Sequence, residues 1–537
     1  MKSIQFLIAA VAATTVLTAN AKDLEPVPKL SEADFGKAKQ VYFDRCAGCH
    51  GTLRKGATGL PLTPDKTRTK TVEKLADIIY TGTEGGMPGW GVTGVLSKEE
   101  STLLAKFIQN EPVPPPEFNM KDMEATWKLH VPVEKRPTKP EHKYNIDNLF
   151  AVILRDAGQI GIIDGDTKQV VTVVNSGFAV HTLRYSASKR YLYTIGRDAK
   201  ATIVDLYMNP PQTVAEVKTG FDARSIESSK YKGKKGDFND KYAVVGNYWP
   251  PSYVILDGFT LKPLKVVGTR GYTYDTQEYH PEPRVASIVA SHYDPEWIIN
   301  VKETGQVLLV DYSDIKNLKV TAIESERFLH DGGWDKTKRY FLVAANMRDK
   351  LVAIDAKTKK LAGIVETGIK PHPGRGANIM DPKFGPVYAT PHLGEPAITF
   401  VGTDPEGKYK ANAWKAVRKL KTGGEGGLFI KTHPKSNHIW VDHTLAKDAD
   451  ATRSVSLFDI KNLDAPPKVI KLGDRGRITH MEYNKAGDEV WIALWDRKGE
   501  IIVMDDKTGK EKTRITDPRL VTPTGKFNVY NTTADIY

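Results

Sequence analysis

Two cysteines and a histidine near the start of the chain carry its most specific chemical signal. They are Cys46, Cys49 and His50, in the order Cys-Ala-Gly-Cys-His, and the chain has no other cysteine. Two thiols three residues apart can add to the two vinyl groups of one porphyrin, and the adjacent imidazole then ligates the iron. The run therefore predicts covalent attachment of a c-type haem. The alternative is a local redox disulfide, which an exported protein can also hold.

The segment around this motif is predicted to form a small helical domain. Ser31 is an N-cap candidate followed by acidic residues, and Thr71–Ile79 and Ser97–Ile108 have amphipathic helical spacing. Glu100 completes a capping-box pattern at the start of the latter helix. A run of prolines at 112–116 ends the domain, because proline lacks the amide hydrogen that a helix needs.

The first 21 residues have the features of a secretory signal peptide. Lys2 supplies the positive end, Phe6–Leu17 the apolar stretch, and Ala21 ends a small-residue cleavage site. No later run reaches the roughly 18 apolar residues of a membrane span, so we expect a soluble periplasmic protein. The remaining chain of about 516 residues is long enough for two or more domains.

The charge balance gives little indication of a partner. The formal net charge is +12 for the whole chain and one lower without Lys2. A basic surface can steer acidic partners or anions. The lysines and arginines are scattered beside acidic residues, which favours a solvated surface of mixed charge and gives no indication of nucleic acid.

From about residue 145 the pattern changes to short β-rich runs that recur about every 50 residues. Each run ends in an aspartate, except that the sixth is degenerate and its aspartate is displaced to Asp404. Eight copies predict an eight-bladed β-propeller, because four-stranded sheets bury their faces only against their neighbours; a solenoid is the alternative. The runs are 160–164, 202–205, 253–257, 307–311, 351–355, 398–401, 455–459 and 501–505.

Histidines recur at one phase of this repeat. If each aspartate-ended run is the third strand of a blade, the first, axis-lining strand starts near His181 in blade two and near His330 in blade five. His372 and His480 hold similar positions in blades six and eight. One such histidine would more often be structural. Several at one phase predict a shared site, because imidazole ligates metals and carries protons near neutral pH.

Arginines occupy the neighbouring turns. The turn between the second and third strands lies on the same face of a propeller as the start of the first strand. It carries Arg155 in blade one and Arg197 in blade two, and Arg348 and Arg497 occupy related turns. Guanidinium groups bind carboxylates in a bidentate fork. The sequence therefore predicts a pocket at one mouth of the channel that suits a metalloporphyrin with acidic side chains.

Long stretches of the chain also resemble the cytochrome cd1 nitrite reductases, and the resemblance covers nearly all of the mature sequence. It implies a signal peptide (1–21), a small all-α c-type cytochrome domain (22–135) with haem c, and an eight-bladed propeller (136–537) that binds non-covalent haem d1 in a homodimer. The stretches that carry it are Leu154–Gln159, Gly177–His181, Tyr248–Pro251, Phe328–Trp334, His372–Asn378 and Thr522–Thr532.

The resemblance implies roles for individual residues of the propeller. His181 would be the proximal ligand of the d1 iron, and His330 and His372 would be the distal pair beside nitrite. Arginines would hold the carboxylates of haem d1, and three further side chains would belong to its pocket. These residues are Arg155, Arg184, Arg197, Arg224 and Arg375, with Tyr248, His480 and Thr524.

In the c-type domain, His50 supplies one axial ligand and the family motif makes Met87 the other. Met87 lies in the run Gly-Gly-Met-Pro-Gly-Trp at 85–90. A thioether is a soft ligand that raises the reduction potential relative to a second histidine. The alternative is that Met87 fills a gap in the haem pocket.

The activity that the resemblance implies is the one-electron reduction of nitrite to nitric oxide and water, with oxygen reduction as a side activity. Electrons would enter haem c from a small soluble c-type cytochrome or a cupredoxin. Two other functions stay open: a haem d1 maturation dehydrogenase acting on a dihydro precursor, and a haem c electron carrier whose propeller only binds proteins.

Two departures from the family pattern concern the distal pocket. Some members place a tyrosine from an N-terminal arm over haem d1, whereas the segment 22–34 here is short and has no tyrosine. The chain also has His480 where the family commonly has glutamine. The first departure argues against gating of haem d1 by a distal tyrosine, and the second changes the expected polarity of the haem d1 pocket.

Overall fold

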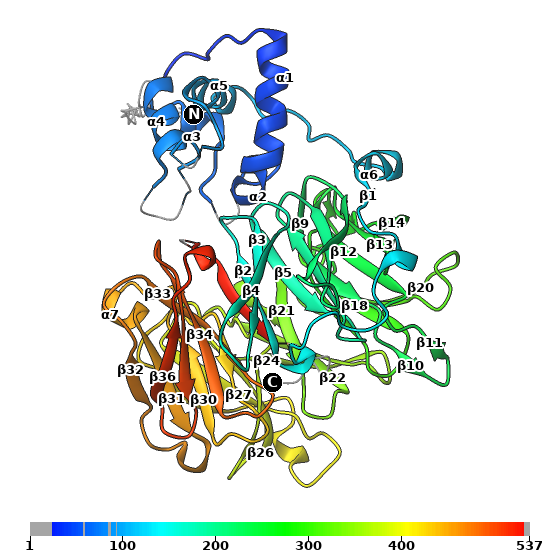
Figure 1. Cartoon of the computed structure of the whole chain (residues 1–537), viewed down its shortest axis with the longest axis vertical. Helices are drawn as coiled ribbons and strands as arrows, with labels where there is room; N and C mark the ends of the chain where they lie inside the picture. Colours follow the sequence, from blue (N-terminus) through cyan, green and yellow to red (C-terminus); the bar gives the residue numbers. More distant parts are fainter. Residues whose placement is uncertain are drawn as a thin grey trace, which may run out of the picture. The chain divides into compact units, whose positions relative to one another are not determined.

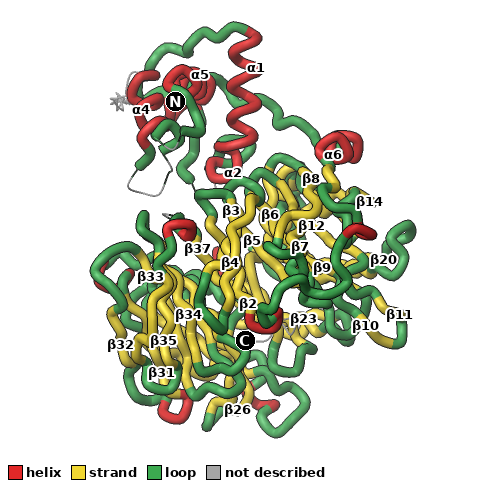
Figure 2. The backbone as a smooth tube through the Cα atoms, viewed as in Figure 1, coloured by secondary structure: helices red, strands yellow, loops and turns green. Residues whose placement is uncertain are grey.

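The computed structural model describes residues 24–56, 59–83, 87, 89–92, 94–522 and 524–530, so the expected signal peptide lies outside the described residues. The chain divides into two compact units. One comprises the residues up to Tyr42 together with Cys49–Pro114, and the other comprises Phe43–Gly48 and the chain from Pro115 onward. Helices dominate the first unit and strands the second (Figure 2). Residues 115–135, assigned to the cytochrome domain from the sequence, lie in the second unit.

The first unit contains the helices that its capping signals predict. Ser31 caps α1 (Glu32–Val41) by accepting a hydrogen bond from the Asp34 amide, and the capping box of Ser97 and Glu100 begins α5 (Lys98–Ile108). Helix α4 (Val72–Thr81) packs against α5, as α1 does. Helix α3 (Pro64–Thr67) completes the unit. A π-helical turn (Tyr42–Cys46) and α2 (Ala47–His50) span the division of the chain, since residues 43–48 belong to the second unit.

In the described chain the second unit is a ring of eight antiparallel sheets, seven with four strands and one, blade two, with a fifth strand added at its edge, which confirms the predicted propeller. In Figure 1 the strand colours pass from cyan through green and yellow to red around it. Blades one to four are β37 (Lys526–Tyr530), β2 (Leu149–Leu154), β3 (Gln159–Asp164), β4 (Val170–Asn175); β5 (Val180–Tyr185), β6 (Tyr191–Gly196), β7 (Lys200–Asp205), β8 (Gln212–Lys218); β9 (Asp222–Ser228), β12 (Tyr242–Trp249), β13 (Ser252–Asp257), β14 (Pro263–Gly268); and β17 (Val285–Ala290), β18 (Glu296–Val301), β19 (Gln306–Asp311), β20 (Lys319–Glu324).

Blades five to eight follow the same order from the innermost strand outward. They are β21 (Leu329–Trp334), β22 (Tyr340–Ala345), β23 (Lys350–Asp355), β24 (Lys360–Glu366); β25 (Ala377–Asp381), β26 (Gly385–Pro391), β27 (Ala397–Gly402), β28 (Ala416–Lys421); β29 (Ile430–Lys431), β30 (His438–Asp442), β31 (Ser454–Asp459), β32 (Lys468–Lys471); and β33 (Arg477–Tyr483), β34 (Glu489–Trp495), β35 (Glu500–Asp505), β36 (Lys510–Ile515).

The other described elements of this unit are short. Helix α6 (Met120–Thr126) packs on β8 and β14, and α7 (Ala449–Thr452) precedes β31. Strand β1 (Lys128–Leu129) adds a fifth strand to blade two by pairing with β8. Two hairpins and six 3₁₀ turns make up the rest: β10 (Lys232–Gly233), β11 (Gly236–Asp237), β15 (Gly271–Tyr272), β16 (Tyr279–His280), and Val133–Lys135, Ile146–Asn148, Asn346–Arg348, Lys410–Asn412, Ile460–Asn462 and Pro518–Leu520.

The core of the propeller lies between the blades. Within the described chain, each pair of neighbouring blades shares one cluster of buried apolar side chains. Between blades eight and one, Phe150 stacks on Trp491 with ring centroids 3.9 Å apart. The aspartate-ended runs all lie on third strands, whose two faces are buried against the neighbouring blades. This placement explains why they are more apolar than an alternating pattern.

The ring is closed by the end of the chain. Strand β37 pairs antiparallel with β2 from Tyr530 opposite Phe150 to Lys526 opposite Leu154. The innermost strand of blade one therefore comes from the C-terminal segment and the other three from the beginning of the propeller (Figure 1). No described helix is both long and apolar enough to cross a bilayer.

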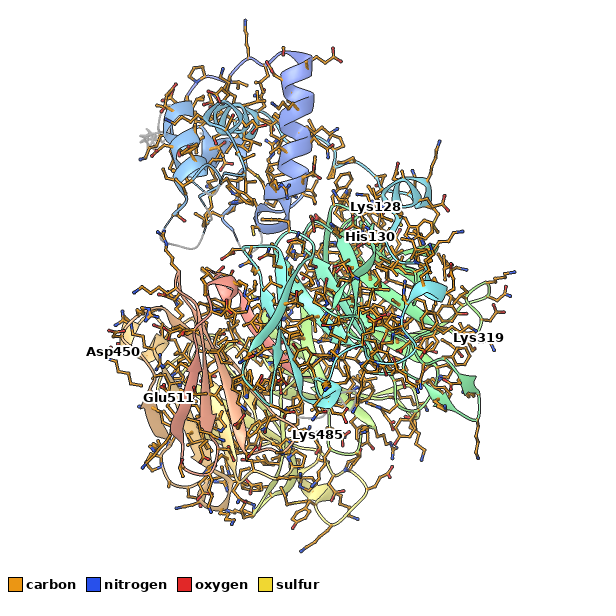
Figure 3. All side chains as sticks on the ribbon, in the orientation of Figure 1. Lys128, His130, Lys319, Asp450, Lys485 and Glu511 are labelled. Carbon is orange, nitrogen blue, oxygen red and sulfur yellow. The ribbon has the colours of Figure 1, made fainter. Side chains whose placement is uncertain are left out.

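Charged side chains at the outer edges of the blades are mostly paired with groups of opposite sign. Figure 3 labels Lys128 and His130, which lie 3.4 and 3.6 Å from the Glu216 carboxylate, and Lys485, which lies 2.6 Å from Asp147. Pairs of this kind contribute little to stability individually. They agree with the expected solvated surface of mixed charge.

Candidate functional site

Irregular positions on the innermost strands bring the candidate residues to the channel. Strands β5, β9, β21 and β33 each shift register against their neighbours near one residue or pair. The shifts fall at His181, at Arg224, at His330 with Asp331, and at His480. A β-bulge turns one side chain out of the regular alternation, and such bulges are common beside active sites. Four blades therefore present a histidine or arginine by the same local device.

Hydrogen bonds fix the tautomer of His181. Its Nδ1 lies 3.2 Å from the Arg224 carbonyl oxygen and 3.2 Å from the Thr182 hydroxyl, which itself donates to that carbonyl at 2.7 Å. Because both partners can only accept from the ring, Nδ1 carries the hydrogen and Nε2 keeps its lone pair. Burial, followed by the positive charge of Arg224 and Arg197, lowers the pKa of His181 well below its ordinary value. A neutral imidazole with its Nε2 lone pair available is the form that ligates a metal.

Cationic side chains surround this imidazole on the side of blades two to four. Arg224 donates to the Tyr248 hydroxyl at 3.0 Å, and Arg197 lies over the ring of Tyr248 at 4.9 Å. Burial alone would raise the pKa of Tyr248, but Arg224, Lys302 and further arginines lower it. Burial also lowers the pKa of Lys302. These shifts indicate a strongly positive environment that would bind anionic groups.

One of these arginines already has a buried partner. The Nε and Nη2 atoms of Arg197 donate to the two carboxylate oxygens of Asp222, each at 2.8 Å. This bidentate pair fixes the plane of the guanidinium group. Arg197 is therefore oriented before any ligand arrives.

The C-terminal segment completes the same face. Arg155 donates to the Thr524 hydroxyl at 3.4 Å, and Thr524 donates from its amide to Asp156 at 2.7 Å. The Asp156 amide in turn donates to Thr522 at 3.0 Å. The turn after β2 and the segment before β37 are thus held together, although they are far apart in the sequence.

His330, Asp331 and His372 form a compact polar group on blades five and six. His330 donates from Nδ1 to the Asp331 carboxylate at 2.8 Å, and His372 Nδ1 lies 3.6 Å from the other oxygen of that carboxylate. The two rings have centroids 4.9 Å apart. His372 Nδ1 also lies 2.9 Å from the Leu428 carbonyl oxygen, which can only accept, so this nitrogen carries hydrogen too.

The charge states of this group follow from its surroundings. Burial and then Arg224 lower the pKa of His330 well below its ordinary value, although Asp331 opposes them. Burial acts to raise the pKa of Asp331, but His372, His330 and Arg224 hold it well below the usual range of a carboxyl group. Asp331 is therefore ionised and faces two ring N–H groups.

Further buried charged groups lie on the innermost strands of blades seven and eight. Lys431 of β29 is 3.2 Å from Glu482 of β33, and burial lowers the pKa of Lys431 to about 8 despite this partner. Arg375 and Arg184 contribute to the same lowering, which brings these two arginines into the site. A Cβ on Gly333 would lie 1.9 Å from the Arg375 carbonyl oxygen, so only glycine allows blade five to approach Arg375 so closely.

His480 has an aromatic environment. Its ring meets Phe429 edge to face with centroids 4.3 Å apart, and Phe527 lies at 6.0 Å. Burial lowers the pKa of His480 well below its ordinary value, with Lys431 as a secondary cause. The backbone at His480 has φ +45°, and its amide donates to the buried Asp442 carboxylate at 3.0 Å.

The candidate haem c residues follow helix α1 in the chain. His50 Nδ1 lies 2.8 Å from the Leu60 carbonyl oxygen, so this nitrogen carries hydrogen and Nε2 keeps its lone pair. Burial lowers the pKa of His50, which keeps the ring neutral. Cys46 and Cys49 are half-buried thiols at the end of the π-helical turn and in α2. Met87 is half-buried, and its amide and carbonyl bond to Thr83.

The residues of the second unit fit a metalloporphyrin that carries acidic side chains. His181 offers an Nε2 ligand, arginines on several blades offer donors to carboxylates, and Phe429 offers an apolar ring beside His372 at 6.3 Å. Cys46, Cys49 and the neutral imidazole of His50 fit covalent haem c. These two donor sets therefore suit the two haems that the sequence predicts.

The structure brings together the propeller residues singled out from the sequence, through contacts or electrostatic coupling. Arg348 and Arg497 lie in the turns expected, but Arg348 pairs with Asp275 and Glu326, and Arg497 is exposed. Sequence reasoning missed several charged residues of the site, although Asp331 lies inside Phe328–Trp334, one of the stretches that carry the family resemblance. These residues are Asp222, Lys302, Asp331, Lys431, Asp442 and Glu482.

Comparisons with known proteins agree with this geometry. Residues 144–532 match the family described as the cytochrome D1 heme domain, and residues 33–108 match the family of the cbb3-type cytochrome c oxidase subunit III. The chain is 51% identical to a nitrite reductase of Stutzerimonas stutzeri over 95% of both chains. It is 24% identical to a dihydro-heme d1 dehydrogenase of Pseudomonas aeruginosa over 94% of this chain and 95% of that one.

A solved structure supports the fold as well. The dihydro-heme d1 dehydrogenase NirN in complex with DHE superposes with a TM-score of 0.71 at 23% identity, covering 92% of this chain and 98% of that chain. The two family matches confirm the expected pair of haem-binding domains. The chain therefore belongs to the cytochrome d1 haem domain family and carries a cytochrome c domain ahead of its propeller.

Proposed function

We propose that this chain is a respiratory nitrite reductase, which converts nitrite, one electron and two protons into nitric oxide and water. The observation that carries the proposal is the pair His330 and His372 around one ionised carboxylate, in the channel that also holds His181. The 51% identical nitrite reductase of Stutzerimonas stutzeri supports it. Oxygen reduction at the same site is a side activity of this proposal.

His181 would ligate the haem d1 iron through Nε2. Arginines and three other side chains would hold the macrocycle and its carboxylates: Arg155, Arg184, Arg197, Arg224, Arg375, Tyr248, His480 and Thr524. Cys46 and Cys49 would attach haem c, with His50 and Met87 as its axial ligands. When bound, haem d1 supplies an iron that takes nitrite and receives the electron from haem c.

His330 and His372 would act as general acids. Nitrite is an anion, and Arg224 and Lys302 make their surroundings positive enough to attract it. The Nδ1 atoms of both rings are held by acceptors on the protein, so each ring offers Nε2 to the substrate. A proton held at Nε2 can pass to the oxygen that leaves as water.

The setting of the enzyme is part of the proposal. The sequence features of residues 1–21 support export to the periplasm, with the cytochrome domain over 22–135 and the propeller over 136–537. A small soluble c-type cytochrome or a cupredoxin would reduce haem c. The active form would be a homodimer, as the family resemblance implies.

A haem d1 maturation dehydrogenase is the second candidate, because one relative of that name matches over 94% of this chain. The fold is common to both candidates, so retention of haem d1 distinguishes them. A reductase keeps haem d1 as a cofactor, whereas a maturation enzyme releases its product. A haem c carrier with a non-catalytic propeller would hold no chromophore beyond haem c.

The first experiment is an absorption spectrum of the protein from its native host, before and after acid–acetone extraction. A green extractable chromophore, with c-type bands left on the protein, would support two haems. A spectrum with only c-type bands, even after reconstitution with haem d1, would overturn the proposed reductase activity. Nitrite turnover that survives the double substitution His330→Ala and His372→Ala would overturn the proposed acid role.

A further inference from the structure

Asp331 is the group around which the two candidate acids are arranged. It follows His330 at the irregular position of β21 and is coupled to His372 of blade six. One carboxylate oxygen accepts from His330 Nδ1 at 2.8 Å, and the other lies 3.6 Å from His372 Nδ1. Its side chain is only 19% exposed. The carboxylate therefore lies between two imidazoles and is largely shielded from solvent.

Ligand atoms of these three residues lie within 4.8 Å of one another, so a cation is the competing use of the group. The observed contacts favour the other use. His330 Nδ1 points its hydrogen at Asp331, and His372 Nδ1 points its hydrogen at the Leu428 carbonyl. Each of these nitrogens is a donor, whereas a metal ligand must offer a lone pair.

We propose that Asp331 is a positioning residue that holds His330 with Nδ1–H turned inward and Nε2 available, and whose negative charge favours a transferable proton on His330 and on the neighbouring His372. The inference rests on the proposed function, because it assigns the regulation of proton supply at that same site. Asp331 acts through the two histidines. The carboxylates that orient metal-bound or catalytic imidazoles act in the same way in other proteins.

The charges that face this group come from several elements. Arg224 of β9 and Lys302 beside β18 disfavour an imidazolium, and His181 of β5 is electrostatically coupled to His330. The Tyr388 hydroxyl of β26 is also coupled to this group, since Asp331 acts to raise the pKa of Tyr388 and Arg375 acts to lower it. The named groups other than Asp331 are cationic or neutral, so this carboxylate is the one that favours a proton on the pair.

The test replaces the carboxylate without changing its size. Asp331→Asn offers one oxygen acceptor and no charge, so protonation of both rings becomes less favourable. The matched control is Asp335→Asn, at the other end of the same strand, where the carboxylate binds Thr337 and backbone amides. Asp331→Glu restores the charge with a displaced carboxylate. We expect it to recover part of the loss.

Two measurements distinguish positioning from a structural role. The first is deuterium exchange of each imidazole C2 proton, followed by mass spectrometry against pH in the full chain before haem d1 is added. We expect Asp331→Asn to move the midpoint of His330 to lower pH and the control to leave it in place. The second is the pH profile of kcat in the holoenzyme. In Asp331→Asn, kcat should fall about 10- to 100-fold at neutral pH, and the profile should move toward acid.

The outcomes separate this inference from the proposed function. An unchanged midpoint of His330 and an unchanged pH profile in Asp331→Asn would overturn the inference, and so would loss of haem d1 from that variant alone. If the double histidine variant still turns over nitrite, the proposed function fails whatever Asp331 does. If Asp331→Asn does not fold, the Glu variant decides, because a displaced carboxylate must still shift the midpoint of His330.

Discussion

The buried pair of Arg197 and Asp222 allows a quantitative prediction about how the site is prepared for its cofactor. The guanidinium and carboxylate groups share two hydrogen bonds of 2.8 Å, and their side chains are 9% and 5% exposed. Asp222→Asn keeps the shape of the side chain. It places an amide N–H against a guanidinium N–H and leaves the arginine without its counter-charge.

The expected loss of stability follows from these features. Removing one partner of a buried pair costs about 3–5 kcal/mol. Burial raises the pKa of Asp222 even beside Arg197, so the pair does not fully offset the desolvation of this carboxylate. The lower end of the range, about 3 kcal/mol, is therefore expected. At roughly 2 °C per kcal/mol for a large domain, Tm should fall by about 6 °C.

Thermal unfolding of the full chain, followed by circular dichroism with and without haem d1, measures this loss. The carboxylates of haem d1 can replace the missing counter-charge, so loading should raise Tm more in Asp222→Asn than in the wild type. The matched control is Asp205→Asn, which removes a similar bidentate partner from Arg190 at the other end of β7. An Asp222→Asn protein as stable as the wild type without haem d1, or equal rescue of both variants, would refute the reasoning.

Two further predictions concern one residue in each unit. Met87→Ala should lower the reduction potential of haem c, because a thioether ligand raises it. A redox titration measures this, with a substitution of the exposed Met380, Met380→Ala, as the control. Equal potentials in Met87→Ala and the wild type would show that Met87 is not a ligand. Lys526 is fully buried, its Nζ has no hydrogen-bond partner among the described residues, and burial lowers its pKa to about 8. Below pH 8 the native state therefore keeps a buried ammonium that lowers its free energy of unfolding. Because the unfolded chain keeps this proton up to about pH 10.5, the free energy of unfolding rises with pH from about 8 to 10.5. Lys526→Met should stabilise the protein by about 3 kcal/mol at pH 7 and much less near pH 10 in denaturant titrations, whereas an equal gain at both pH values would contradict this origin.

The repeat made the propeller predictable from the sequence. A third strand is buried on both faces, so its composition is apolar in every blade, and in every blade but the sixth an aspartate ends it before the turn to the fourth strand. Two of the predicted first strands, at His181 and His330, followed from counting back from these runs. Capping residues such as Ser97 identified the helices in the same local way.

The contacts between side chains inside the channel are harder to predict from the sequence. A bulge at Arg224 or His480 depends on the register between strands, which no local pattern encodes. The contact between Asp331 and His372 joins two blades, and the bond from His372 to the Leu428 carbonyl brings in a third. Side chains that meet across blades are recognisable only once the ring has closed.

The closure of the ring has a consequence for the order of assembly. Strand β37 is encoded after every other strand, yet it pairs with β2, and the bond from Arg155 to Thr524 joins residues 369 positions apart. Such a distant pairing has a large loop-closure cost and forms late in folding. The pocket that includes Thr524 therefore requires β37 to be in place, so a chain that stops short of residue 524 lacks one wall of that pocket.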